Sequence, residues 1–301
     1  MIATDVLTRE EIKHFSKSND LKAAWVVVSN WLMIAAIFAM VAVWPNVFTV
    51  ILAILLLGGR QLGLAVIMHE CGHGSMFTRW SWNKFAAQWL AAAFILSDAK
   101  QYRIKHGKHH RLGGTEEDPD LANYRDYAIA RKRFLRKIRR DLTGRTAIKI
   151  FLFSVKTQGW RGVVKWTIAN GAMFAVLWAT GHPWLYLLWP AAWATSHMVV
   201  IRIRQAAEHA AVPDLYDPDP RKHTRTTIPR PWEKLFLAPN KVNYHLEHHI
   251  LPSVPCYNLT AFHEHLKAKG ALEGADICQS YWQVIGKLIL PPEAESEASA
   301  A

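Results

Sequence analysis

Four long apolar stretches constrain this chain of 301 residues more than any other feature. They cover about 23–44, 47–68, 163–180 and 184–203, and few charged residues interrupt them. About 20 residues of α-helix, at about 1.5 Å per residue, cross the roughly 30 Å hydrocarbon core of a bilayer. The sequence therefore predicts an all-α integral membrane protein with four transmembrane helices.

A shorter apolar stretch and the distribution of basic residues predict how the rest of the chain is placed. The stretch at about 85–96 is too short to cross a bilayer and is interpreted as a re-entrant or interfacial helix. The turns at 45–46 and 181–183 contain no lysine or arginine, whereas residues 98–162 contain 17. Positive charge is typical of cytoplasmic segments. We therefore expect both termini and a helical cap on the cytoplasmic side.

The net charge of +12 does not indicate a nucleic-acid partner. The run RKRFLRKIRR at 131–140 interleaves basic residues with Phe134, Leu135 and Ile138, which is typical of an interfacial helix on anionic lipid. Three cysteines without a C-x-x-C pair favour a reducing compartment. We expect one domain over 1–290, followed by a disordered acidic tail at 291–301.

The histidines carry the strongest chemical signal. The chain has 15 of them, and eight fall in three clusters that contain His69 and His73; His106, His109 and His110; and His245, His248 and His249. Positions i, i+3 and i+4 lie on one face of a helix, so each H-x-x-H-H motif is expected to aim three imidazoles at one point. Neutral imidazole binds Zn, Cu, Fe and Ni, so the clusters predict a metal site.

The stretch HECGH at 69–73 fits the H-E-x-x-H signature of zinc proteases, but the other clusters argue against that interpretation. A catalytic zinc site needs three protein ligands, and zinc does no redox chemistry. Eight histidines suit two metals, which suggests iron, O2 and attack on an unactivated C–H bond. Glu70 is then expected to accept a hydrogen bond from a ligand imidazole rather than to act as a base. A metal transporter would need ligands within the membrane core, whereas these clusters lie at its edge.

Three segments resemble the histidine boxes of the membrane fatty acid desaturase and hydroxylase superfamily. They are MHECGHGSMF (68–77), YRIKHGKHHRLGGTEEDPDL (102–121) and NYHLEHHILPSVPCYNL (243–259), in the same order as in that superfamily. The resemblance covers about 25–265. It implies four transmembrane helices, a cytoplasmic cap and two non-haem irons held by about nine histidines.

The resemblance also implies site residues outside the boxes. The ninth ligand would lie on the cytoplasmic extension of the fourth helix, where RQAAEHA offers His209. Gln205, one turn earlier, is expected to reach a metal through water, and Asn243 is expected to orient the third box. The remaining histidines, including His197 and His223, share no spacing and are not expected to be ligands.

The function implied by the resemblance is that of an O2-dependent oxidoreductase, a fatty acid desaturase that introduces a double bond into a lipid acyl chain. No fused cytochrome or flavin domain is expected, so electrons would come from a ferredoxin, rubredoxin or separate cytochrome drawn to the basic face. A multi-pass protein of the bacterial inner membrane with a cytoplasmic metal site is expected. A carotenoid ketolase or hydroxylase, a lipid hydroxylase, an alkene-forming decarboxylase and, in another class, an intramembrane zinc metalloprotease remain alternatives. The regiochemistry, the acyl carrier and the oligomeric state stay open.

Overall fold

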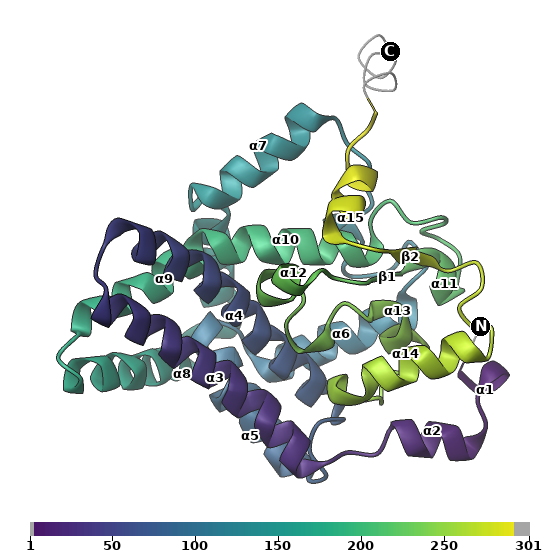
Figure 1. The fold of residues 1–301 in the computed structure, drawn as a ribbon, viewed down its shortest axis with the longest axis horizontal. Coiled ribbons are helices and arrows are strands. Elements are labelled where there is room, and N and C mark those ends of the chain that lie inside the picture. Colours follow the sequence, from purple (N-terminus) through teal and green to yellow (C-terminus); the bar gives the residue numbers. More distant parts are fainter. Residues whose placement is uncertain (1–2, 292–301) are drawn as a thin grey trace.

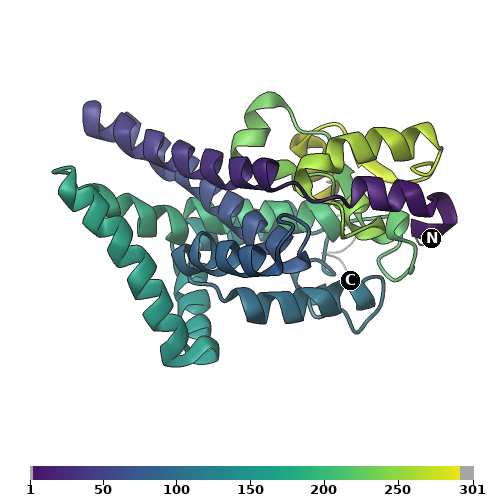
Figure 2. The same ribbon diagram turned by 90° about the horizontal axis from the view of Figure 1, so that it is seen from below.

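The computed structural model describes residues 3–291 and is built mainly of helices, which gather at two ends of an elongated molecule. Long apolar helices form one end, with α3 and α4 on one side and α8 on the other, and the shorter elements form the other end (Figures 1 and 2). The helices, with short 3-10 turns written η, are α1 (Ala3–Val6), α2 (Arg9–Phe15), α3 (Asp20–Val43), α4 (Val47–His73), α5 (Trp80–Trp89), η1 (Ala92–Ile95), α6 (Ala99–Leu112), η2 (Leu121–Asn123), α7 (Arg131–Leu142), α8 (Arg145–Ala179), η3 (Pro183–Leu187), α9 (Leu188–Ala194), α10 (Ser196–His209), α11 (Pro220–His223), α12 (Pro231–Phe236), η4 (Pro239–Lys241), α13 (His245–Ile250), η5 (Cys256–Asn258), α14 (Leu259–Ala268) and α15 (Tyr281–Leu288).

Within residues 3–291, three helices are long and apolar enough to cross a membrane: α3, α4 and α8. The first two confirm the predicted helices at 23–44 and 47–68. Asn46 starts α4, because its side-chain oxygen accepts hydrogen bonds from the backbone N–H groups of Phe48 and Thr49. The helix then continues to His73 and ends at Gly74, whose φ of 74° suits glycine. The first histidine cluster therefore lies on the last turn and a half of a helix that is long and apolar enough to cross a membrane.

The third predicted span is the second arm of a longer, bent helix. α8 begins at Arg145 and bends at Gly159, whose backbone leaves the helical region at φ 63° and ψ −167°. The bend is held by the segment around η1: Gln158 donates from Nε2 to the Leu96 carbonyl at 3.0 Å, and Asn170 donates to the Ala93 carbonyl at 3.2 Å. Two arms, 145–158 and 160–179, thus enclose η1.

The fourth predicted span, 184–203, is not one helix. It consists of η3, α9 and the first half of α10, and the backbone of Thr195 breaks it at φ −125° and ψ −86°. Pro190 lacks an N–H, and the hydroxyls of Thr195 and Ser196 donate to backbone carbonyls, which competes with a regular helix. A fourth crossing stays a prediction. α10 runs on to His209, and its extension beyond the membrane surface stays a prediction.

The short apolar stretch at 85–96 also differs from the single helix expected. α5 ends at Trp89, and η1 follows after a break at residues 90–91. The segment predicted as an interfacial helix at 131–140 is α7, which buries Phe134 and leaves Leu135 exposed.

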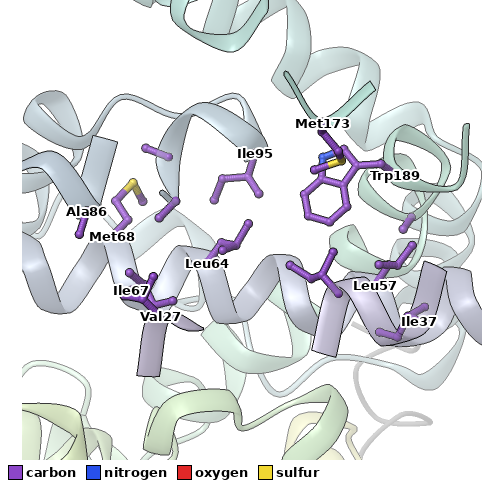
Figure 3. Packing of buried hydrophobic residues seen from close by; sticks show 14 of the residues in the cluster. Val27, Ile37, Leu57, Leu64, Ile67, Met68, Ala86, Ile95, Met173 and Trp189 are labelled. Carbon is purple, nitrogen blue, oxygen red and sulfur yellow. The ribbon is translucent and has the colours of Figure 1, made fainter. Parts of the chain in front are cut away.

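The apolar core is centred on α4, which contacts α3, α5, α9 and α10. Figure 3 shows Leu57, Leu64, Ile67 and Met68 of α4 packed with side chains from the surrounding helices. Gly58 permits a close approach of α10 to α4: a Cβ atom there would lie 2.8 Å from the backbone nitrogen of His197. α10 therefore rests directly on the backbone of α4, and both helices run from this core to the histidines.

The second end of the molecule is a helical cap that also contains two short strands, which the all-α prediction did not include. β1 (Arg225–Thr227) and β2 (Asp276–Cys278) pair in parallel. Buried Arg225 ties them together and to α10, since it bonds Asp276 at 2.8 Å and the Ala207 carbonyl at 3.1 Å. The single domain over 1–290 stays a prediction, and the tail predicted at 291–301 lies outside the described residues apart from Pro291.

Candidate metal centre

All nine histidines predicted as ligands meet where the membrane helices join the cap. His69 and His73 come from the end of α4, and His209 is the last residue of α10. The second cluster lies on α6 and the third on α13. Their roles as metal ligands stay a prediction, but their placement together is a property of the fold.

The nine side chains form two groups, and in each group the nitrogens that can bind a metal lie within 4.8 Å of one another. Group one contains His69, His73, His106, His110 and His248, and group two contains His109, His209, His245 and His249. The prediction that each H-x-x-H-H motif aims at one point is wrong. Each motif divides its histidines: in α6 the i, i+4 pair serves group one, whereas in α13 that pair serves group two.

The spacing of the nitrogens fits bound metal ions. Nε2 of His106 lies 2.9 Å from Nε2 of His110, and Nε2 of His209 lies 2.8 Å from Nε2 of His245. Two imidazole nitrogens at a right angle on one ion, each at about 2.1 Å, are about 3 Å apart. Among the described residues, Nε2 atoms of His69, His73 and His249 are buried without a hydrogen-bond partner. Such atoms are rare in native proteins, and a metal would satisfy them.

Three of the imidazoles are fixed by hydrogen-bond acceptors on their other nitrogen. Nδ1 of His69 bonds Glu70 at 2.9 Å, Nδ1 of His109 bonds Asp118 at 2.9 Å, and Nδ1 of His209 bonds the His223 carbonyl at 3.0 Å. Nδ1 of His245 lies 3.5 Å from the carboxylate of Glu208. An acceptor on Nδ1 holds the proton there and leaves the Nε2 lone pair free for a metal. This arrangement is typical of histidine ligands.

The electrostatics keep these side chains in the form that binds metals. Burial, together with the neighbouring imidazoles, lowers the pKa of His110 to about 2. The same causes hold the pKa of His106, His209, His245, His248 and His249 well below the usual range. Neutral imidazole is therefore present at physiological pH without competition from protons.

Glu70 occupies the position expected for a partner of a ligand imidazole. One of its carboxylate oxygens bonds His69, and the other accepts the backbone N–H of Cys256 at 2.8 Å. With both oxygens engaged and the side chain buried, Glu70 is not placed to activate water as the base of a zinc protease. This geometry argues against the interpretation of HECGH as a protease signature.

The other two predicted residues lie near the site in different ways. Asn243 is buried and donates from Nδ2 to the Thr227 carbonyl at 3.0 Å, so it attaches the start of α13 to β1. Gln205 lines the same cavity as His209. Its contact with a metal through water stays a prediction.

Three residues at the site were not predicted as partners from the sequence. His223 supplies the carbonyl that fixes His209, and its ring stacks on His209 at 6.3 Å between centroids. Glu208 contacts His245 and forms an ion pair with Arg204, and burial raises the pKa of Glu208 to about 8. Tyr124 donates to Asp118 and stacks on His209 at 4.9 Å. The loops that bring in His223 and Tyr124 carry no spacing that would have identified them.

A cavity of about 500 Å³ adjoins both groups. Its wall contains His69 and His106 of group one and His109, His209 and His245 of group two. Away from the histidines, the wall is mostly apolar and is formed by α4, the first arm of α8, α9 and α10. Charged side chains, including Lys105 and Arg204, line its other part. The cavity thus joins an apolar wall to both groups of histidines.

Comparison with known proteins agrees with this geometry. The family model described as "Fatty acid desaturase" matches residues 42–281, which include all nine histidines. The protein named dihydrorhizobitoxine desaturase, from Bradyrhizobium elkanii, is 26% identical over 242 residues, an alignment that covers 69% of this chain and 65% of that protein. The chain thus spans slightly less than two thirds of the length of that relative. Because the family match covers most of the chain, the protein belongs to the fatty acid desaturase family.

Proposed function

We propose that this protein is an O2-dependent diiron oxidoreductase that introduces a double bond into the acyl chain of a lipid. One observation carries the proposal: two adjacent groups of largely buried histidines line the same cavity, and the remainder of that cavity is largely apolar. Family membership supports a desaturase-type oxidoreductase in a membrane, and the reaction and substrate named here go beyond it.

The two groups would each hold one iron ion. His69, His73, His106, His110 and His248 would hold the first, and His109, His209, His245 and His249 the second. Two irons held there would supply redox chemistry with O2 that is strong enough to break an unactivated C–H bond. One O2, two electrons from a donor and two protons, with two hydrogens from adjacent carbons, balance to one double bond and two waters.

The protein's own contribution would be position and exclusion of water. Val66 and Ile95 lie in the cavity wall with His69 of group one and His209 of group two, so an extended acyl chain along this wall would pass beside both groups. A displacement of about 1 Å at the reacting carbons changes rates strongly, so rigid packing against α4 matters for the outcome. The relative named a desaturase supports desaturation over hydroxylation. The substrate in its name is a property of that protein.

A separate electron donor would approach from the cytoplasmic face of the cap. A second cavity of about 400 Å³ is lined by His69, His73 and His106 and by the basic side chains Arg103, Lys108 and Arg111. Positive charge around a path to group one suits an acidic redox protein, because complementary charge speeds encounter. This placement supports the proposal of a ferredoxin, rubredoxin or cytochrome as partner.

The test combines metal content with lipid analysis. We expect about two irons per chain in the purified protein, as two groups of imidazole ligands would bind, and new unsaturated acyl chains in cells that express it. His109→Ala should lower both, whereas His182→Ala, which alters a histidine in the turn before η3, should change neither. One zinc per chain without iron, or unchanged acyl chains in cells with iron-loaded protein and a competent donor, would contradict the proposal.

A further inference from the structure

A groove on the apolar end of the molecule shares a wall with the cavity at the histidines. The groove has a volume of about 470 Å³ and lies between the two arms of α8, η1 and α9. Ile95, Leu96 and Trp193 line both the groove and the cavity. These three side chains therefore separate the cavity at the histidines from the outer surface of the apolar end of the molecule.

The bend in α8 is what makes this groove. Ile148 on the first arm and Trp166 on the second line it together, which a straight helix would not allow, since 18 residues of helix extend about 27 Å. The first arm of α8 lines both the groove and the cavity. Ala147, Phe151 and Leu152 face the groove, whereas Ile150 and Phe153 face the cavity. The groove and the cavity thus lie on opposite faces of one helix arm.

The lining of the groove suits a hydrocarbon chain. None of the side chains that line it carries a charge. Its two polar side chains are already bonded, because Tyr186 donates to Asn170 at 3.3 Å and Asn170 donates to the Ala93 carbonyl. Ile148 and Leu152 are each 62% exposed, on an arm that continues into the second, membrane-spanning arm. These side chains are well placed to contact lipid.

Basic residues lie beside the groove, where a lipid head group would be. Arg145 and Lys149 are exposed. Arg145 stands three positions before Ile148 and Lys149 three positions before Leu152, so each shares a face of the helix with a groove residue. The positive charge favours an anionic head group, either the carboxylate of a fatty acid or the phosphate of a phospholipid.

Two of the three side chains that separate the groove from the cavity have features of a movable wall. Leu96 has a left-handed backbone, with φ 55° and ψ 45°, which is strained for a leucine. Its carbonyl is held from the bend of α8 by Gln158. Trp193 is only partly buried and lies two residues before the break in the helix at Thr195. Leu96 therefore lies outside a regular helix, and Trp193 lies one residue before the end of α9.

We propose that this groove is the lateral entry site for the acyl chain of an anionic lipid dissolved in the bilayer, and that Leu96 and Trp193 form the gate into the catalytic cavity. The inference rests on the proposed function, and it names the substrate class as a membrane lipid rather than a water-soluble thioester. The chain would lie in the groove with its head group near Arg145 and Lys149. Displacement of the two gate side chains would then admit it to the cavity.

The binding test uses the full-length, iron-loaded protein in phosphatidylglycerol vesicles. One sample contains a photoreactive free fatty acid, and another contains phosphatidylglycerol with the same photoreactive chain. We expect labelled peptides to map to 148–152 and Trp193, and the sample that labels identifies the head group. The blocking variant is Ala194→Phe, which narrows the groove, and its matched control is Ala172→Phe, which narrows a separate apolar groove bordered by Ala172, Met173 and Trp31.

We expect Ala194→Phe to lower both the labelling and the conversion of bilayer lipid by about tenfold. This is the lower end of the rate change that one methylene group too many or too few causes in an apolar pocket. Ala172→Phe should change neither. Leu96→Gly, which suits the left-handed backbone, should speed conversion. Because its expected effect is a gain, this variant tests the gate even if Ala194→Phe fails to fold. Labelling spread evenly over the apolar surface, or conversion unaffected by Ala194→Phe, would overturn the entry site. Labelling confined to the groove in a protein that converts no acyl chain would support the proposed entry site and contradict the proposed function.

Discussion

Asp118→Asn gives the sharpest test of the two-group arrangement, because Asp118 supports one group and not the other. Its carboxylate accepts Nδ1–H of His109 at 2.9 and 3.0 Å. It also accepts the hydroxyl of Tyr124, whose ring stacks on His209. Burial alone would raise the pKa of Asp118, but the hydrogen bonds from His109 and Tyr124 hold it below the usual value. An anionic carboxylate therefore orients two members of group two.

The expected magnitude follows from the loss of this charged acceptor. Removing the partner of a ligand imidazole typically weakens metal binding by about 10- to 100-fold, or about 1.4–2.7 kcal/mol. Asp118 forms no hydrogen bond with a group-one histidine among the described contacts. We therefore expect the variant to lose one iron at chelator concentrations that leave the other in place, so that iron per chain falls from about two to about one.

The assay is equilibrium dialysis of the variant against increasing chelator, with iron measured by mass spectrometry. Asp120→Asn is the matched control. It removes the same charge two residues away, yet Asp120 bonds Lys105 and Asn123 rather than an imidazole. The reasoning is refuted if the two variants lose iron equally, since charge alone would then explain the effect. It is also refuted if Asp118→Asn releases both irons at the same chelator concentration.

Three further predictions follow from the same contacts. Tyr124→Phe keeps the ring on His209 but loses its hydroxyl bond to Asp118, so it should weaken group two less than Asp118→Asn in the same dialysis. Gly58→Val places side-chain atoms against the backbone of α10 and should lower the free energy of unfolding by about 1–3 kcal/mol. Gly171→Val is the control, because open space surrounds Gly171 and the variant should not show this packing cost. Thermal unfolding in detergent compares the two variants. Chelation should lower the melting temperature, and the chelated protein should lose further stability as pH falls below about 6.5, by up to about 1.4 kcal/mol per pH unit for each buried histidine. Stability falls with falling pH because burial holds the pKa of His110 and its neighbours in the folded chain below the value in the unfolded chain, so the unfolded chain takes up protons first. A free energy of unfolding that does not change from about pH 7.5 to 5.5 would contradict this prediction.

The spacing in the sequence singled out eight of the nine histidines that the fold brings together, and helix geometry explains why it did not predict how they divide into two groups. His109 and His110 are adjacent, so their side chains diverge by about 100° around the helix axis and cannot both reach one ion. The i, i+4 pair converges, and the i+3 residue reaches a second point. An H-x-x-H-H motif on a helix therefore predicts two centres rather than one, which the clusters alone could have revealed.

Other features depended on tertiary structure. His209 was found only through the resemblance, because a single histidine at a helix end has no distinctive spacing. His223 reaches the site through a turn held against Gly114, where a Cβ atom would come within 2.9 Å of Nδ1 of His223. The bend at Gly159 and the break at Thr195 arise from one glycine and two hydroxyl side chains, and neither disturbs the apolar pattern enough to be seen.

The division of the ligands explains why this cap and these membrane helices belong together. Group one takes two histidines from α4 and three from α6 and α13, and group two takes His209 from α10 and three from α6 and α13. Neither part of the protein can complete either group alone, so a metal bound in either group would tie α6 and α13 to a helix that runs into the apolar end. α4 and α10 also touch directly at Gly58. The position of the cavity relative to the apolar helices is therefore set by two helices in contact. In the proposed function, this contact would keep an acyl chain that enters from the membrane aligned with the histidines.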